Sequence, residues 1–154
     1  MKNQIKTDTR LAFIQFIFSS FFSDRSIEEN SNDFEKYFNK LSVSSIEHKE
    51  ESLISFNKPY FNKLVLNYDR FIKNNIVEDI VNPLISFDRK FESWDQINKS
   101  IILSIFSELE ITKKEKIKIL LNDYLNISKL LIPKIELGMI NAIADKYINE
   151  KKII

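Results

Sequence analysis

Few side chains in this sequence belong to types that could carry out catalysis. The single histidine, His48, lies in the polar stretch SSIEHKEE, and the adjacent carboxylates Glu28–Glu29 and Glu50–Glu51 lie in similar surroundings. General acid–base catalysis needs a carboxyl group whose pKa is raised by an apolar wall, and a catalytic histidine needs a nucleophile and an orienting partner. We therefore interpret these residues as solvated side chains and predict no catalytic site.

The residue types also disfavour metal and cofactor sites. The chain has no cysteine, which removes thiol nucleophiles and cysteine-ligated metals. Its single glycine, Gly138, is too few for a glycine-rich phosphate loop, a dinucleotide fingerprint or a G-x-S-x-G nucleophile turn. We predict no metal, no cofactor and no small-molecule substrate, and hence a binding protein that is not an enzyme.

Basic side chains near the amino terminus form the one pattern that suits a ligand. Lys2, Lys6 and Arg10 recur every four residues, and they would share one face if the first helix extends back through them. A cationic face of this kind attracts phosphate oxygens. The segment therefore predicts a contact with nucleic acid.

Aromatic residues follow this basic segment directly. Phe13, Phe16 and Phe18 could stack on unpaired bases, or they could belong to the apolar core. The core interpretation is favoured for Phe13 and Phe16, and both interpretations stay open for Phe18.

Size and charge fit one domain with an uneven surface. The chain has 154 residues, of which 44% are hydrophobic and 29% are charged, and its net charge is +1. Residues 24–51 hold eight carboxylates against four basic side chains, whereas residues 113–134 hold six lysines against two acids. A global basic field is therefore absent, but basic surfaces at both ends flank an acidic middle.

Apolar residues recur at helical spacing along most of the chain, and we predict an all-α fold of about seven helices. In the first half we expect a helix from residue 7 or 8 to about 22. A second is expected over 33–41, with Asn32 and Glu35 as its capping pair. Pro59 suits the first turn of a third segment, which runs to Pro83 as one long helix or two in tandem.

The second half carries clearer boundary signals. The pairs Ser93–Gln96 and Thr112–Glu115 have the spacing of capping boxes and predict the next two helix starts. Pro133 predicts the start of the last helix. The residues expected to point inward from it are Ile135, Met139, Ile140, Ile143 and Tyr147.

The uncharged run from Leu11 to Ser23 allows two interpretations, because a basic start followed by an apolar run also describes a signal peptide. Asp8 lies before the run, and Gln15 interrupts it. A dozen residues cannot span a bilayer, which needs about 20. We therefore favour a buried helix in a cytoplasmic protein, and we predict no membrane association.

Several stretches of the chain resemble the NusB family of transcription antitermination factors. TRLAFIQFIF resembles the family's basic A-R-x-x-x-x-Q-x-L-Y start, with Arg10, Gln15 and Phe18 in matching places. Residues 97–110 resemble V-x-R/K-x-I-L-R-x-A-x-x-E-L, and KILLNDYLNISK resembles the helix V-x-I-N-E-A-V-E-L-A-K. IELGMINAIAD resembles F-V-N-G-V-L-D, with Gly138 on the glycine. These stretches extend, in order, along nearly the whole chain.

This resemblance implies a single NusB-like domain over residues 1–154, with two packed helical sub-bundles over about 1–75 and about 76–154. It implies binding to boxA-type leader RNA of ribosomal RNA transcripts, together with the small-subunit ribosomal protein NusE, in the RNA polymerase antitermination complex. Single-stranded RNA suits this function because its bases can be splayed onto side chains. The RNA-binding residues would be Lys2, Lys6 and Arg10 on phosphates, and Gln15 and Phe18 on an unpaired base. The surface for the protein partner stays open.

Departures from the family pattern keep other interpretations open. Thr7 and Asp8 replace basic residues before Arg10, and Ile135 and Leu137 replace the aromatic residue and the asparagine of the F-V-N-G stretch. The main alternative is a NusB-like protein-interaction module that has lost RNA binding. A NusB-like domain also precedes the catalytic domain of some ribosomal RNA cytosine methyltransferases, but this sequence lacks the glycine-rich region that such an enzyme needs.

Overall fold

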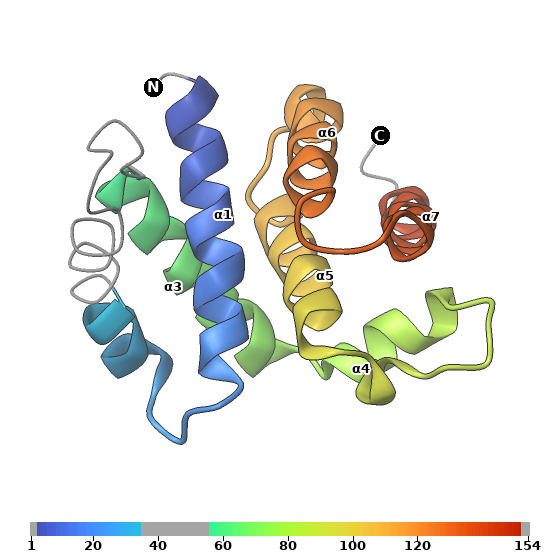
Figure 1. Cartoon of the computed structure of the whole chain (residues 1–154), viewed down its shortest axis with the longest axis horizontal. Helices are drawn as coiled ribbons and strands as arrows, with labels where there is room; N and C mark the ends of the chain where they lie inside the picture. Colours follow the sequence, from blue (N-terminus) through green and yellow to red (C-terminus); the bar gives the residue numbers. More distant parts are fainter. Residues whose placement is uncertain (1–2, 35–55, 152–154) are drawn as a thin grey trace.

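The computed structural model describes residues 3–34 and 56–151, and all its regular elements are helical (Figure 1). The helices are α1 (Asn3–Ser20), a helix over residues 27–34, α3 (Lys58–Asn74), α4 (Val77–Val81), α5 (Gln96–Leu109), α6 (Ile117–Ser128) and α7 (Lys134–Glu150). Three 3-10 turns cover Asn82–Leu84, Phe91–Ser93 and Lys114–Lys116. The described residues include no strand, which confirms the predicted all-α fold of about seven helices.

Helix α5 is the centre of the molecule. It packs against α1 and α3 on one side and against α6 and α7 on the other (Figure 1). Its residues from Ser100 to Leu109 are all buried. Because one apolar cluster includes residues from 12 to 148, the two predicted sub-bundles share a single core around α5.

Three serines inside α5 make this close packing possible. Ser100, Ser104 and Ser107 are fully buried, and their hydroxyls donate to the carbonyl oxygens of Gln96, Ile101 and Ser104. A small side chain whose hydroxyl is bonded within its own helix brings no unsatisfied polar group into the core. Neighbouring helices can therefore contact α5 all round its circumference.

Helix α1 begins earlier than its apolar run suggests. It starts at Asn3, so Lys6 and Arg10 lie within one continuous helix. The predicted basic face depended on this extension of the helix toward the amino terminus. Phe13 and Phe16 are fully buried, which confirms the core interpretation for both rings. The helix stops at Ser20, whose hydroxyl donates to a carbonyl three residues back and competes with the helical hydrogen bonds.

Both capping boxes predicted in the second half are wrong. The Ser93 hydroxyl donates to the Lys90 carbonyl (2.8 Å), and the Thr112 hydroxyl donates to the Glu108 carbonyl (2.6 Å). Each hydroxyl therefore closes the preceding turn or helix and does not accept from the next one. Helices α5 and α6 begin later, at Gln96 and Ile117.

The predicted start of the second helix is also wrong. A true capping box lies upstream, where the Ser26 hydroxyl accepts from the Glu29 amide (3.1 Å) and the Glu29 carboxylate accepts from the Ser26 amide (3.2 Å). Asn32 consequently lies inside the helix over 27–34. The remainder of the predicted helix, His48 and the pair Glu50–Glu51 lie outside the described residues.

Other boundaries agree with the sequence. The Asn57 side chain accepts from the Tyr60 amide (2.8 Å) and caps α3, with Pro59 in its first turn. The predicted third segment consists of two helices in tandem, because α3 ends at Asn74 and α4 begins at Val77. Pro133 precedes α7 as predicted. Ile135 was expected to point inward but is 80% exposed, because the first turn of α7 extends beyond the core.

Replacing Gly138 with alanine is expected to stabilise the protein by about 1 kcal/mol, because glycine is a poor helix former. Apart from its chain neighbours and the adjacent backbone of α7, a methyl group on its Cα would meet no atom within 4 Å. We expect the midpoint of thermal unfolding to rise by about 2–4 °C. The matched control is Ala142→Gly at another exposed position of α7, which should lower the midpoint by a similar amount. A lower midpoint for Gly138→Ala would contradict this prediction.

Candidate nucleic-acid interface

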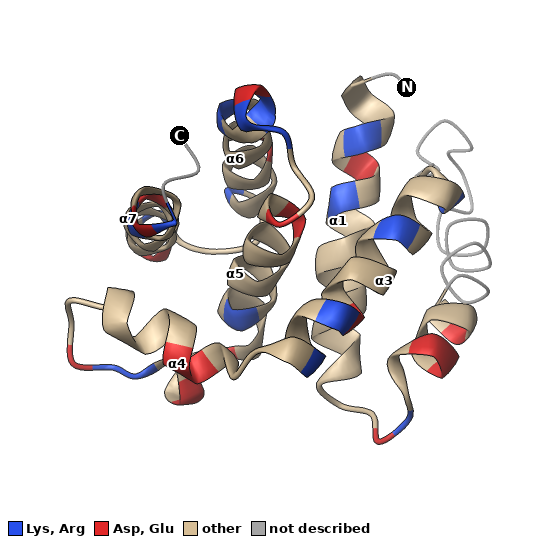
Figure 2. Cartoon of the chain, turned by 180° about the vertical axis from the view of Figure 1, so that it is seen from behind, with Lys and Arg blue, Asp and Glu red and all other residues tan. Residues whose placement is uncertain are grey.

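Basic side chains from two distant segments gather at one end of the molecule. Lys6 lies in the amino-terminal half of α1. Four exposed lysines surround the turn Lys114–Lys116 and the start of α6: Lys113, Lys114, Lys116 and Lys118. Figure 2 shows both groups in blue at the same end of the fold. Asp8 and Glu115 are the acidic residues of these two segments, so cationic side chains are in excess.

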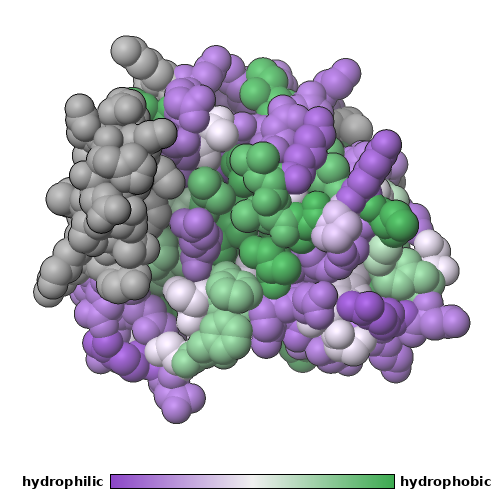
Figure 3. All heavy atoms as spheres, viewed as in Figure 1, coloured by the Kyte–Doolittle hydropathy of each residue, from purple (hydrophilic) through white to green (hydrophobic). Residues whose placement is uncertain are grey.

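A groove of about 480 Å³ runs between α1 and α6. Its lining residues are Asn3, Lys6, Thr7, Arg10, Thr112, Lys116, Ile119, Leu120, Asn122, Asp123 and Asn126. Figure 3 shows apolar surface gathered over the seam between α1 and α6, with hydrophilic surface on both sides of it. A polyanion with flat apolar groups, such as a single nucleic-acid strand, fits a surface of this composition.

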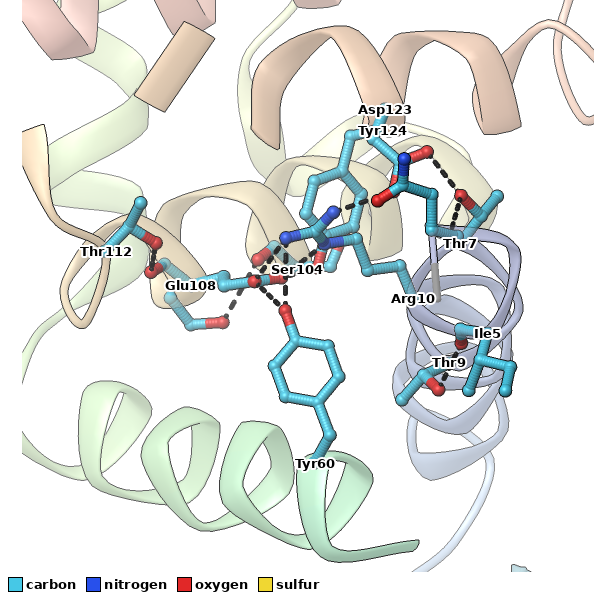
Figure 4. Close-up of polar contacts among 12 residues, drawn as sticks. Ile5, Thr7, Thr9, Arg10, Tyr60, Ser104, Glu108, Thr112, Asp123 and Tyr124 are labelled. Atoms are coloured by element: carbon cyan, nitrogen blue, oxygen red, sulfur yellow. Dashed lines mark hydrogen bonds and ion pairs between the residues drawn. The ribbon is translucent and has the colours of Figure 1, made fainter. Parts of the chain in front are cut away.

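The floor of the groove contains Arg10, whose side chain is buried and paired (Figure 4). Its Nε and Nη2 donate to the two carboxylate oxygens of Glu108 (3.1 and 2.9 Å), and its Nη1 donates to Asp123 Oδ2 (2.7 Å). Arg10 is only 7% exposed. The guanidinium therefore joins α1 to α5 and α6, and it does not project into solvent as a phosphate contact would require.

Two tyrosines complete this buried cluster. The Tyr124 hydroxyl donates to Glu108 Oε1 (2.6 Å), and the Tyr60 hydroxyl donates to Glu108 Oε2. Burial raises the pKa of both tyrosines, and the negative charge of Glu108 raises it further. Burial alone would lower the pKa of Arg10, but its hydrogen bonds to Glu108 and the charge of that carboxylate outweigh this effect, so its pKa lies above the usual value. Arg10 and Tyr60 both stay protonated at neutral pH.

Asp123 is the one carboxylate among the described lining residues of the groove, and it is already neutralised. Its Oδ2 accepts from Arg10 and its Oδ1 accepts from the Thr7 hydroxyl (2.7 Å). Because both oxygens are engaged and the charge is paired, Asp123 opposes an anionic ligand only weakly. The groove thus presents Lys6 and Lys116 without a competing free carboxylate.

A second hollow of about 450 Å³ lies on the other side of α6, between α6 and α7. It shares Asn122 and Asn126 with the groove, and Lys129 and Lys134 also line it. The exposed amides of α6 therefore separate two hollows, each with lysines on its border. Amide side chains both donate and accept hydrogen bonds, which suits the edges of bases.

The other predicted RNA-binding residues do not join this surface. Gln15 and Phe18 are exposed, but neither lines the groove. Phe18 is twelve residues from Lys6, which is about 18 Å along the helix and about a third of a turn around it. Phe18 instead packs edge-to-face on Phe22 (5.2 Å between ring centroids). Lys2 lies outside the described residues.

The residues that α6 contributes to the groove were not predicted from the sequence. The excess of lysines over residues 113–134 indicated a basic surface but not its location. Asn122 and Asn126 are one helical turn apart, and that spacing was the available signal for a polar face. Nothing local in the sequence places that face beside Lys6.

Comparison with known proteins identifies no relative, since no family model, no curated protein and no solved structure matches the chain. Within the described residues, no helix has the length and apolar character needed to cross a membrane. The same residues contain no group of three acidic, histidine or cysteine side chains that could hold a metal ion. What defines the protein is therefore an all-helical fold with a lysine-bordered groove between α1 and α6.

Proposed function

We propose that the protein binds single-stranded RNA in the groove between α1 and α6 and acts as a NusB-like transcription antitermination factor. In this proposal it binds boxA-type leader RNA together with the ribosomal protein NusE. The observation that carries it is the shared position of Lys6 and Lys116 in one groove whose lining carboxylate, Asp123, is already paired. The resemblance of the sequence to the NusB family supplies the RNA class.

The residue types of the groove support a single strand over a duplex. Lysines on its border suit phosphates, while Ile119, which is 61% exposed, and the amides of Asn122 and Asn126 suit base faces and base edges. In a duplex these faces and edges are stacked and paired, and only backbone contacts would remain. The strand would cross α6 and reach the second hollow near Lys129.

Replacing Lys6 and Lys116 together with alanine is expected to weaken binding to a fluorescein-labelled boxA-like RNA by about tenfold or more at low salt. Each lost phosphate contact lowers the slope of log affinity against log salt by about 0.7, so the slope should fall by about 1.4. Fluorescence anisotropy between about 50 and 200 mM salt measures both quantities.

The matched control is Lys63→Ala on α3, which removes an exposed lysine that does not line the groove. Its affinity and salt slope should equal those of the wild type. A scrambled RNA tests sequence preference. If the Lys6/Lys116 double variant retains wild-type affinity and slope, the groove is not the RNA site.

A protein-interaction module without RNA binding is the second candidate. The exposed aromatic pair Phe18 and Phe22 favours it, because these rings are 36% and 67% exposed and lie away from the groove. Pull-down with the ribosomal protein, with and without RNA, separates the two functions. Partner binding that is unaffected by RNA, together with no retained RNA, would support the second candidate.

A further inference from the structure

A pocket of about 240 Å³ lies away from the groove, where residues 89–98 meet the first turns of α7. Its polar groups come from Asn98 and Glu136, and its apolar wall is formed by Trp94, Ile135, Met139 and Ile140. None of these residues lines the groove between α1 and α6. The pocket is therefore separate from the proposed RNA site.

Asn98, which lines this pocket, carries an unsatisfied acceptor. The residue is 6% exposed, and its Nδ2 donates to Glu136 Oε1 (2.6 Å). Its Oδ1 is buried and has no hydrogen-bond partner within the described residues. Exchanging the two ends of the amide would place Oδ1 against the Glu136 carboxylate, so the orientation is fixed by chemistry. A buried acceptor without a donor carries an uncompensated desolvation cost.

Glu136 is the second acceptor. It forms no ion pair with any described residue, and its one hydrogen bond comes from Asn98. The pocket thus combines one acceptor without a donor, Asn98 Oδ1, and one carboxylate without a cation, Glu136, with an aromatic and aliphatic wall. Arg89 lines the pocket too, and it is exposed. A ligand that satisfies both acceptors must carry hydrogen-bond donors, and a positive charge on it would pair with the Glu136 carboxylate.

We propose that this pocket binds an arginine side chain of a protein partner. A guanidinium has several N–H donors in one plane, so it can donate to Glu136 and to Asn98 Oδ1 at once. It is also weakly hydrated and packs well on aromatic groups, here Trp94. Lysine concentrates its charge at one point and fits two separated acceptors less well. A phosphate is excluded by the Glu136 carboxylate.

Access to Asn98 Oδ1 requires a small change in the pocket wall, because this atom is shielded from solvent in the structure. Met139 lines the pocket, is only partly buried and has three rotatable bonds, so this part of the wall can change shape at low cost. Glu136 is partly exposed and can make the first contact. The guanidinium would then reach Asn98 as the wall opens.

Trp94 is the only tryptophan of the chain, so its indole N–H resonance reports on this pocket alone. The test is a titration of the full-length protein with N-acetyl-argininamide, followed by that resonance. The matched probe is N-acetyl-citrullinamide, which has nearly the same shape but no charge. We expect saturable shifts with the arginine derivative at roughly millimolar concentration, since a lone side chain makes few contacts. The citrulline derivative should give none.

Three variants test the assignment. Glu136→Gln keeps an acceptor for Asn98 Nδ2 and should weaken binding of the arginine derivative by about tenfold or more. Glu150→Gln, an exposed position at the far end of α7, has the same change in charge and should behave like the wild type. Arg89→Ala removes a like charge and should strengthen binding by about twofold. Equal responses to arginine and citrulline, or unchanged binding by folded Glu136→Gln, would overturn the proposal.

Discussion

Replacing Arg10 with alanine is expected to lower the free energy of unfolding by about 3–5 kcal/mol. Glu108 is only 3% exposed, and the substitution would leave its carboxylate buried without the cation that faces it. The loss is large because a domain of this kind is stable by only about 5–15 kcal/mol. Urea unfolding followed by far-ultraviolet circular dichroism measures it.

Arg25→Ala provides the matched control for this prediction. Arg25 also contacts two carboxylates, Glu29 and Asp33, but its side chain is 50% exposed. Exposed ion pairs contribute about 0–1 kcal/mol, so this variant should unfold at nearly the wild-type urea concentration. Equal small losses for both variants would show that the Arg10 cluster contributes no more than a surface ion pair.

A double variant tests the physical cause. Arg10→Met combined with Glu108→Leu removes both charges and fills the space with apolar side chains. Replacing a whole buried pair is often close to neutral, whereas removing one partner is costly. The double variant should therefore be more stable than Arg10→Ala, although Tyr60 and Tyr124 lose their acceptor. A double variant less stable than Arg10→Ala would show that these hydroxyl contacts dominate.

The role of Arg10 determines how RNA-binding data must be interpreted. A variant at this position disturbs the contacts between α1, α5 and α6, so a loss of RNA affinity would not identify a phosphate contact. Among the described residues, the side-chain amines of Lys6 and Lys116 make no hydrogen bond or ion pair. Their replacement removes charge from the groove with little effect on packing. The salt slope of that double variant is therefore the direct measure of phosphate contacts.

Helical periodicity predicted the fold because it reports which side of each helix is apolar. Ile140, Ile143 and Tyr147 were expected to point inward from the last helix, and all three are buried. The capping-box predictions were wrong because residue spacing does not show in which direction a hydroxyl forms its hydrogen bond. A hydroxyl at the right distance from a glutamate or glutamine can accept from the next helix or donate to the previous one, and Ser93 and Thr112 donate.

The candidate site was predicted only in part, for a related reason. Spacing along α1 placed Lys6 and Arg10 on one face, but it could not show what covers that face. Glu108 and Asp123, which pair with Arg10, lie 98 and 113 positions away in the chain. Contacts over such separations depend on how the helices pack, and no local pattern encodes them. For the same reason the groove formed with α6 could not be predicted.

Alkaline pH is expected to unfold the protein cooperatively, because three buried tyrosines hold their protons more tightly when folded than when unfolded. Burial raises the pKa of Tyr68 to about 12, and repulsion from Asp69 adds to this effect. The pKa of Tyr124 and that of Tyr147 are raised in the same direction by burial and by Glu108 and Glu110 respectively. An unfolded tyrosine has a pKa of about 10.

Because the folded state raises the pKa of these tyrosines, the protein should lose stability as pH rises above 10. Below about pH 10 both states keep the phenolic protons, and this contribution to stability is complete. As pH rises above 10, only the unfolded state releases them, so each buried tyrosine removes about 1.4 kcal/mol of stability per pH unit until the folded pKa is reached. Tyrosinate absorbance and the loss of helical circular dichroism should therefore change together, above the pH at which free tyrosine titrates.

Tyr147→Phe isolates one of these protons, because phenylalanine keeps the ring stacked on Phe106 (3.9 Å between centroids) and removes only the hydroxyl. The variant should release about one proton fewer in the alkaline transition, which makes the fall of stability with pH less steep. Its stability at neutral pH should change little, since the hydroxyl's one hydrogen bond, to Glu110, is long (3.3 Å). Tyrosinate absorbance that rises near pH 10 while the helical signal persists would show that Tyr68, Tyr124 and Tyr147 titrate freely in the folded state.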